Sequence, residues 1–188
     1  MKYFIPIGDW PLNIKPYHNL MEKLGWSEGN DNNSDVLILT GGSDIGLRKN
    51  RDSVEINYYA KWVFEKKPIL GICRGMQLMF HINDCDLIQH IPDYSNDYMH
   101  TTISGDWRGQ SSWHTTELGL LTNSRHHQGF ADAPSFWTIL DKTDDGVIES
   151  AMSKLSLFQF GVQWHPEHNE MNNTNAQDWW IETVKQNI

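Results

Sequence analysis

Cys73 stands in the middle of a Gly-x-Cys-x-Gly pentapeptide, residues 71–75. The apolar run 68–72 predicts a buried strand, and apolar residues near helical spacing follow from Met76. Such a turn between strand and helix holds a nucleophile in a strained, exposed position, and its glycines avoid collisions with neighbouring backbone. The free N–H groups and dipole of the helix N-terminus would favour a thiolate. The pentapeptide therefore indicates a cysteine nucleophile, although a structural cysteine at an ordinary strand–helix junction would have the same residues.

A histidine and a carboxylate follow a second apolar stretch, at the end of residues 160–167. A cysteine nucleophile needs a base to accept its proton and protonate the leaving group, and that base needs a carboxylate to orient it. His165 and Glu167 could point to the same side if strand geometry continues through Pro166, which restricts the local backbone. Alone, a surface His-Pro-Glu would explain these residues. Beside Cys73 they predict a triad, because functional groups gather at the carboxyl ends of parallel strands.

Four histidines are candidate metal ligands: His126, His127, His165 and His168. Adjacent histidines on a strand point to opposite faces, so His126 and His127 could not easily share an ion. A nucleophilic cysteine in the same place would also make a zinc ion redundant. We therefore expect no metal and no other cofactor.

The first half of the chain alternates strands and helices. The apolar run 36–39 predicts a fully buried strand that leads directly into residues 41–44, Gly-Gly-Ser-Asp. Alternation at this spacing predicts a parallel sheet covered by helices on both faces. The expected elements here are strands at 3–7, 36–39 and 68–72, and helices at 17–25 and 56–64, the second helix capped by Asp52 or Ser53.

The second half of the chain has a different character. Residues 86–135 are polar and rich in aromatic side chains, histidine and serine, and we expect loops and short strands near the mouth of the site. The pattern then predicts strands at 136–140, 147–152 and 157–164, with a turn at 144–146 and a closing helix at 174–188.

Length and composition limit the class of protein. A chain of 188 residues and 21.8 kDa is most simply one domain, residues 1–188. The net charge of −9 and the absence of a run of Lys or Arg argue against a nucleic-acid partner. Two cysteines form no disulfide framework, no apolar segment approaches the roughly 20 residues that span a bilayer, and the N-terminus does not resemble a signal peptide. These features predict a soluble cytoplasmic protein with no membrane partner.

Three motifs together resemble a known superfamily. Residues 41–44, 71–77 and 161–167 resemble the three signatures of class I glutamine amidotransferase-like proteins. The chain more narrowly resembles the γ-glutamyl hydrolase branch, peptidase family C26. The resemblance runs in order over about residues 36–168, and it implies a flavodoxin-like α/β fold of three layers with a central, mostly parallel sheet and a nucleophile elbow. Three further segments resemble that branch: 51–55 (Arg-Asp-x-x-Glu), 123–128 (Asn-Ser-x-His-His-Gln) and 145–149 (Asp-Gly-x-x-Glu).

The resemblance also implies roles for individual residues. Cys73 would be the nucleophile, His165 the general base and acid, and Glu167 the carboxylate that orients the histidine. The backbone N–H groups of Gly42 and Arg74 would form the oxyanion hole. The guanidinium of Arg74 has two equal interpretations, because it could bind a substrate carboxylate in bidentate fashion or tie down a neighbouring acidic residue.

Substrate contacts follow from the same resemblance. Gln77, one helical turn after the nucleophile, matches a position beside the bound glutamyl group. His126, His127 and Gln128 would support the site or contact the substrate. The segment 82–87 departs from the Gly-Gly-Thr-Leu that is common in the family, and this departure concerns the pocket for the leaving group.

The leading interpretation is a hydrolase that acts on a small γ-glutamylated molecule, forms a γ-glutamyl thioester, and releases glutamate and an amine. The first alternative is a glutaminase subunit that supplies ammonia to a separate synthetase partner. A second alternative, a non-catalytic binding or regulatory member, is disfavoured because cysteine, histidine and glutamate are all present.

Overall fold

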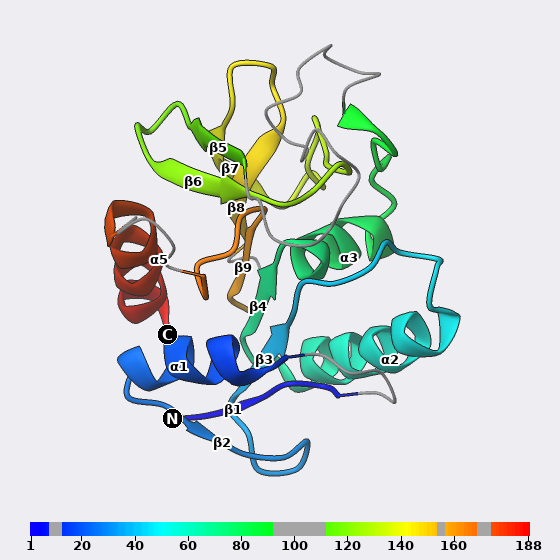
Figure 1. The fold of residues 1–188 in the computed structure, drawn as a ribbon. Coiled ribbons are helices and arrows are strands. Elements are labelled where there is room, and N and C mark those ends of the chain that lie inside the picture. Colours follow the sequence, from blue (N-terminus) through cyan, green and yellow to red (C-terminus); the bar gives the residue numbers. More distant parts are fainter. Residues whose placement is uncertain (8–12, 92–111, 154–156, 169–173) are drawn as a thin grey trace.

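The computed structural model describes residues 1–7, 13–91, 112–153, 157–168 and 174–188. A seven-stranded sheet in the order β2-β1-β3-β4-β9-β8-β7 carries helices on both faces, and β5 and β6 form a separate antiparallel pair (Figure 1). The strands are β1 (Lys2–Phe4), β2 (Ser27–Glu28), β3 (Val36–Leu39), β4 (Ile69–Ile72), β5 (Ser112–Thr115), β6 (Leu121–Ser124), β7 (Thr138–Lys142), β8 (Ile148–Ser153) and β9 (Gln159–Val162). The helices are α1 (Lys15–Lys23), α2 (Lys49–Glu65), α3 (Arg74–Ile82) and α5 (Thr174–Asn187).

The sheet is mostly parallel. Strands β2, β1, β3, β4 and β9 run in one direction, and β8 and β7 complete the sheet in antiparallel pairing. In the register of the central strands, Leu39 pairs with Gly71 and Gly71 pairs with Gly161. The loops that follow β3, β4 and β9 therefore leave the sheet at the same edge, although they are far apart in the sequence.

The continuous apolar run of β3 is explained by the two helical layers. Leu37 and Leu39 face the core that contains residues of α2 and α3, whereas Val36 and Ile38 face the core that contains residues of α1 and α5. All four side chains are fully buried. A strand with helices on both sides needs apolar residues at every position, so the expected three-layer arrangement is confirmed.

The predicted start of the second helix was wrong. Helix α2 begins at Lys49, and neither Asp52 nor Ser53 is its cap. The carboxylate of Asp52 instead accepts a hydrogen bond from the N–H of Gly46 at 2.8 Å and another from Arg74. A tertiary contact therefore uses the side chain that local propensity assigned to capping.

Several strand ends also differ from their predicted positions. Strand β1 ends at Phe4 and not at residue 7, in keeping with Pro6, which has no N–H for a strand ladder. Strand β7 begins at Thr138, because the N–H of Trp137 donates to the carbonyl of Pro134 in a turn at 2.8 Å. Strand β9 ends at Val162, three residues before the predicted base.

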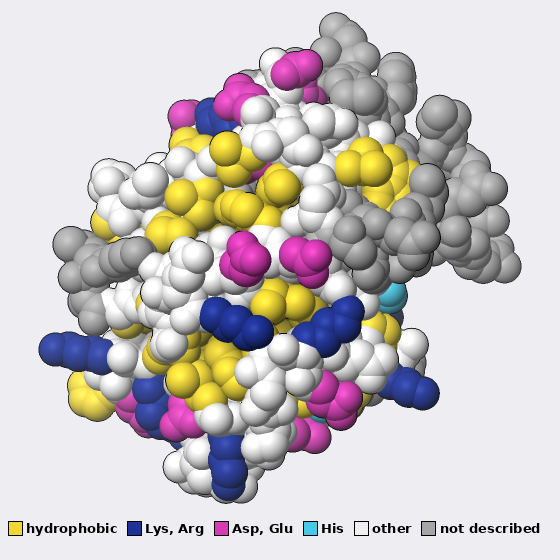
Figure 2. Space-filling view, turned by 90° about the vertical axis from the view of Figure 1, so that its left-hand side faces the viewer, with side chains coloured by type: hydrophobic (Ala, Val, Ile, Leu, Met, Phe, Trp, Pro, Cys, Tyr) yellow, Lys and Arg dark blue, Asp and Glu magenta, His cyan; other side chains and the backbone are white. Residues whose placement is uncertain are grey.

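The described part of residues 86–135 contains the expected loops and short strands. Strands β5 and β6 lie within residues 86–135, and residues 92–111 of that stretch lie outside the described part. No described helix has the length and apolar character needed to span a bilayer. On the face that Figure 2 presents, Lys and Arg side chains are interspersed with Asp and Glu among apolar groups.

Candidate active site

Cys73 lies at a strained turn between β4 and α3. Its φ of 51° and ψ of −112° place a non-glycine residue in a region that L-amino acids rarely adopt. The N–H of Cys73 donates to the carbonyl of Val162 at 2.7 Å, and its carbonyl accepts the N–H of Gln77 at 3.1 Å. The backbone is therefore held on both sides in the conformation of a nucleophile elbow.

The two glycines of the pentapeptide allow this turn to pack closely. A Cβ atom at Gly75 would lie 2.0 Å from the carbonyl oxygen of Leu39, and one at Gly71 would lie 2.7 Å from the backbone nitrogen of Met76. Both distances are too short for real side chains. The glycines are thus required for contact with neighbouring backbone, as the sequence predicted.

The thiol is less exposed than expected, since Cys73 is only 5% exposed. The side-chain amide of Gln163 lies against it, with Nε2 3.6 Å from Sγ. Gln163 comes from the segment just after β9, so the third motif contributes an additional group to the surroundings of the sulfur.

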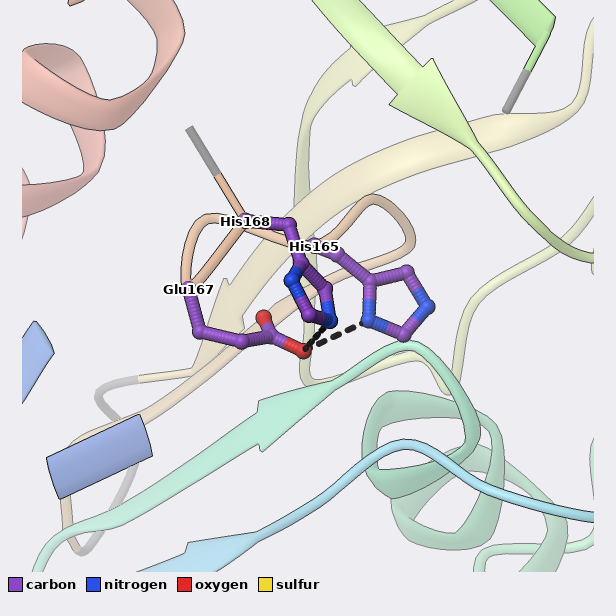
Figure 3. A group of neighbouring side chains, drawn as sticks. All are labelled: His165, Glu167 and His168. Atoms are coloured by element: carbon purple, nitrogen blue, oxygen red, sulfur yellow. Dashed lines mark hydrogen bonds and ion pairs between the residues drawn. The ribbon is translucent and has the colours of Figure 1, made fainter. Parts of the chain in front are cut away.

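His165 and Glu167 form a buried hydrogen-bonded pair. Nδ1 of His165 lies 2.6 Å from Oε1 of Glu167 (Figure 3). The expected reason for this contact was wrong, because β9 has already ended at Val162. A turn brings the two side chains together instead, with the N–H of His168 donating to the carbonyl of His165 at 3.1 Å.

The electrostatic environment of His165 favours its charged form. Burial by itself would lower the pKa of His165, but the charges of Glu167 and Cys73 and the hydrogen bonds to both outweigh burial and raise that pKa to about 10. The carboxyl of Glu167 responds in the opposite direction. Burial would raise its pKa, and the adjacent His165 lowers it. The pair can therefore supply a proton to a leaving group at neutral pH.

The same turn contains the only candidate metal group among the described residues, His165, Glu167 and His168. One ligand atom of each lies within 4.8 Å of the others, and Nε2 of His168 is 3.9 Å from Oε1 of Glu167 (Figure 3). The 2.6 Å contact between His165 and Glu167 needs a proton between nitrogen and oxygen. Nδ1 is then committed to a hydrogen bond, and the donor set fits an oriented histidine better than a metal site.

Two further residues hold the histidine and the loop that faces it. The amide of Asn123, on β6, accepts the N–H of His165 at 2.8 Å and donates to its carbonyl at 3.0 Å. The hydroxyl of Tyr17, on α1, accepts the N–H of Gly41 at 3.1 Å. Burial, followed by the charge of Glu167 and a hydrogen bond to it, raises the pKa of Tyr17 well above its usual value. Tyr17 thus holds the Gly-Gly loop, and its hydroxyl lies close enough to Glu167 for that charge to act on it.

Gly42 and Arg74 are the two expected oxyanion donors. Gly42 has a φ of 149°, and a Cβ there would lie 1.9 Å from Nη1 of Arg51, so only glycine fits. Arg74 is the first residue of α3, where backbone N–H groups have no partner within the helix. Its guanidinium bonds the carboxylates of Asp52 and Glu55. Of the two interpretations of Arg74, tying down acidic neighbours is therefore the one observed.

Gln77 and Gln128 are brought together. Nε2 of Gln77 donates to the backbone carbonyl of Gln128 at 2.9 Å and to the side chain of Gln163 at 3.2 Å. His126 and His127 turn towards different carboxylates. His127 pairs with Asp44 at 3.1 Å, at the end of the Gly-Gly loop.

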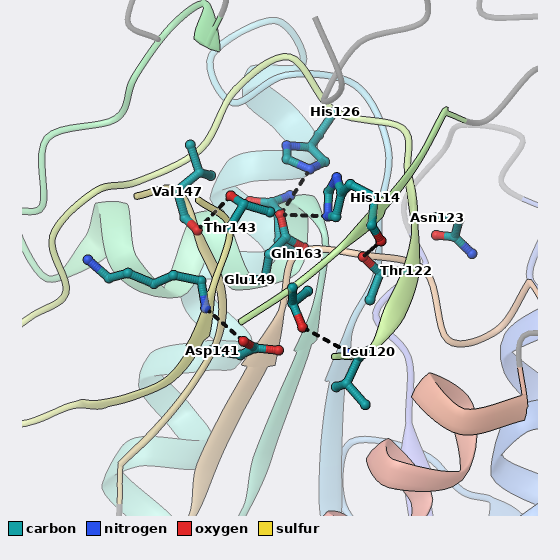
Figure 4. Close-up of polar contacts among 12 residues, drawn as sticks. His114, Leu120, Thr122, Asn123, His126, Asp141, Thr143, Val147, Glu149 and Gln163 are labelled. Atoms are coloured by element: carbon teal, nitrogen blue, oxygen red, sulfur yellow. Dashed lines mark hydrogen bonds and ion pairs between the residues drawn. The ribbon is translucent and has the colours of Figure 1, made fainter. Parts of the chain in front are cut away.

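His126 belongs to a second buried cluster, centred on Glu149 of β8 (Figure 4). Oε1 of Glu149 lies 3.4 Å from Nε2 of His114 and 3.6 Å from Nε2 of His126. Nδ1 of His126 contacts the carbonyl of Gln128 at 2.9 Å, the same oxygen that Gln77 bonds. The cluster therefore supports the segment beside the elbow.

A comparison with protein families agrees with this geometry. The model of the family described as Peptidase C26 matches residues 32–167, which contain all three motifs. The chain belongs to the peptidase C26 family. Through this family, the chain is also a member of the class I glutamine amidotransferase-like superfamily.

Individual relatives of this C26 protein are distant. A glutamine amidotransferase-like protein of Rickettsia prowazekii is 26% identical over 69% of this chain and 63% of the relative. The γ-glutamyl-CDP-amidate hydrolase of Campylobacter jejuni is 27% identical over 80% of this chain and 72% of the relative. The crystal structure of a glutamine amidotransferase from Thermotoga maritima superposes with a TM-score of 0.60 at 14% identity, covering 98% of this chain and 82% of the other. This structural likeness confirms the α/β fold.

The sequence did not predict a role in the C26 site for three residues: Tyr17, Asn123 and Gln163. Tyr17 is the first residue of the helix predicted at 17–25, and no local signal separates it from its core neighbours. Asn123 and Gln163 lay inside recognised motifs but had no assigned role. Only the contacts across the fold show what their side chains do.

Proposed function

We propose that this C26 hydrolase cleaves the γ-glutamyl amide bond of a small γ-glutamylated metabolite and releases glutamate and a free amine. One observation carries the proposal: the buried His165, oriented by Glu167 at 2.6 Å, faces a cysteine held in a strained elbow. This is the arrangement that nucleophilic acyl transfer requires.

The first half of the reaction uses the charged form of His165. The thiolate of Cys73 attacks the γ-carbonyl carbon, and the N–H groups of Gly42 and Arg74 stabilise the negative charge on its oxygen. His165 then gives its proton to the departing nitrogen as the C–N bond breaks. A γ-glutamyl thioester remains on Cys73.

The second half regenerates the enzyme. Having lost its proton, His165 can accept one from a water molecule, which attacks the thioester carbonyl. The C–S bond breaks, glutamate leaves, and the proton on His165 restores the ion pair with the thiolate. Each step is a proton or acyl transfer between this chain's own groups, the substrate and water, so the scheme requires no cofactor.

The choice of a γ-glutamyl group is supported by family membership and by one relative. The Campylobacter jejuni protein bears the name of a γ-glutamyl-CDP-amidate hydrolase. Gln77 matches the family position beside the glutamyl group. In this chain its amide holds Gln128 and Gln163, so we propose that it shapes the glutamyl pocket together with His126, His127 and Gln128.

The decisive experiment measures glutamate release from glutamine, γ-glutamyl-GABA and a γ-glutamyl anilide, with Cys73→Ala as the control. We expect turnover of at least one γ-glutamyl amide other than glutamine, and loss of that turnover in Cys73→Ala. Turnover that survives in the variant would contradict the proposal.

A second candidate is a glutaminase subunit that passes ammonia to a separate synthetase. It is supported by relatives named as glutamine amidotransferase-like proteins and by a match to a GMP synthase of Dictyostelium discoideum, of which this chain aligns with 21%. The same assay separates the two. Activity on glutamine alone, or only when a synthetase is added, would favour the subunit.

A further inference from the structure

The loop that carries Gly42 is anchored at both ends by helix α2. At its beginning, Nη2 of Arg51 donates to the carbonyl of Thr40 at 3.2 Å, to its hydroxyl at 3.1 Å and to the carbonyl of Gly41 at 2.9 Å. At its far end, the N–H of Gly46 donates to Asp52 at 2.8 Å. The position of Gly42 is therefore set by two side chains that are adjacent in α2.

Arg74, the other expected oxyanion donor, is hydrogen-bonded to the same helix through its side chain. The guanidinium of Arg74 donates to Asp52 and to Oε2 of Glu55. The second oxygen of Glu55, Oε1, accepts Nε of Arg51 at 3.0 Å. One carboxylate thus joins the residue that holds the Gly42 loop to the residue whose own N–H is the second donor.

The burial of these charged side chains has a desolvation cost, which indicates that they have a role beyond packing. Arg51, Arg74 and Glu55 are almost fully buried. Buried ion pairs contribute little net stability compared with well-packed apolar residues, because desolvation offsets their attraction. What the charges add is direction, since a planar guanidinium and a carboxylate fix one another's orientation.

We propose that Glu55 is a positioning residue for the oxyanion hole. Through Arg51 and Arg74 it keeps the N–H groups of Gly42 and Arg74 aimed at one point beside Cys73. This gives a function to the Arg-Asp-x-x-Glu motif of residues 51–55. The inference rests on the proposed acyl-transfer function, because the two donors act only when an oxyanion forms.

The test compares two reactions of Cys73. Acylation by p-nitrophenyl acetate passes through an oxyanion, whereas alkylation by iodoacetamide does not. Neither reagent contains a glutamyl group, so a wrong assignment of the natural substrate would leave the test intact. The variant is Glu55→Gln, in which the amide NH₂ must face one of the two guanidinium groups. The matched control is Glu65→Gln, the same change at an exposed position of the same helix.

We expect Glu55→Gln to slow acylation by about 10- to 100-fold, somewhat less than the loss of a whole oxyanion donor, while alkylation changes less than about twofold. Glu65→Gln should leave both rates unchanged. Equal losses in both reactions, or no loss in either, would overturn the proposal. So would a wild-type Cys73 that is alkylated but never acylated.

If Glu55→Gln does not fold, Asp52→Asn is the variant used in the same two reactions. Asp52 is closer to the surface, and its loss frees Gly46 and one side of Arg74. A selective loss of acylation in that variant, smaller than in Glu55→Gln, is expected. If Asp52→Asn folds normally and acylates at the wild-type rate, the network does not position the donors.

Discussion

Two buried groups of histidine and glutamate stand near each other in this fold, and they differ in what they can do. In the first, His165 and Glu167 come from one turn and are 2.6 Å apart. In the second, Glu149 of β8 lies between His114 of β5 and His126, at 3.4 and 3.6 Å. The first is tight and local, and the second joins three separate segments.

The difference in their neighbours decides their roles. His165 faces the sulfur of Cys73, and its pKa is raised to about 10 although burial opposes this. Glu149 is fully buried, which would raise its pKa, but His114 and His126 lower that pKa far below its usual value. We therefore expect the same residue types to serve proton transfer in one place and the docking of a loop in the other.

The largest expected effect comes from removing the base. His165→Asn should reduce γ-glutamyl amide turnover by about 10³- to 10⁴-fold, because the leaving nitrogen loses its proton donor. The measurement is kcat/KM for the best substrate of the panel. His126→Asn is the matched control in the second group, and we expect it to retain at least ten times more activity. Equal losses would mean that the two groups do not differ in role.

The next effect is on stability and concerns the second group. Glu149→Gln should lower the free energy of unfolding by about 3 kcal/mol at pH 7, because His114 and His126 lose a buried charged partner. The folded-state pKa of Glu149 lies below the unfolded value near 4.5, so its contribution is present above that value and is lost as the pH falls through the folded pKa.

Urea unfolding of wild type and Glu149→Gln at pH 7 and at pH 3.5 checks this prediction. The difference between the two proteins should shrink at the lower pH. A difference that stays constant would show that Glu149 does not carry its charge in the folded protein.

The smallest effect concerns the hydroxyl that serves only the first group. Tyr17→Phe removes the acceptor for the N–H of Gly41. We expect about a fivefold loss in kcat, the factor that corresponds to about 1 kcal/mol for one hydrogen bond. Steady-state kinetics and thermal unfolding of the same samples measure both effects. Wild-type kcat in a folded Tyr17→Phe would separate Tyr17 from the site.

Local chemistry in the sequence determined the nucleophile elbow around Cys73 and the layers of the fold. The pentapeptide around Cys73 predicts an elbow because only glycine tolerates such close backbone contact, and the observed 2.0 Å approach at Gly75 agrees. The apolar run 36–39 predicts a doubly covered strand because every position must be buried. Both signals lie within a few residues, so one stretch of sequence contains the whole argument.

Tertiary structure decided which long side chains serve the site. His165 and Glu167 meet through a turn and not through an extended strand, and Arg74 bonds two carboxylates some 20 residues earlier in the chain. Tyr17 joins from α1, outside every motif, and Asn123 joins from β6, within a motif that gave its side chain no role. Hydrogen bonds between distant segments leave no periodic trace in a sequence, because the direction of a side chain depends on how whole elements pack.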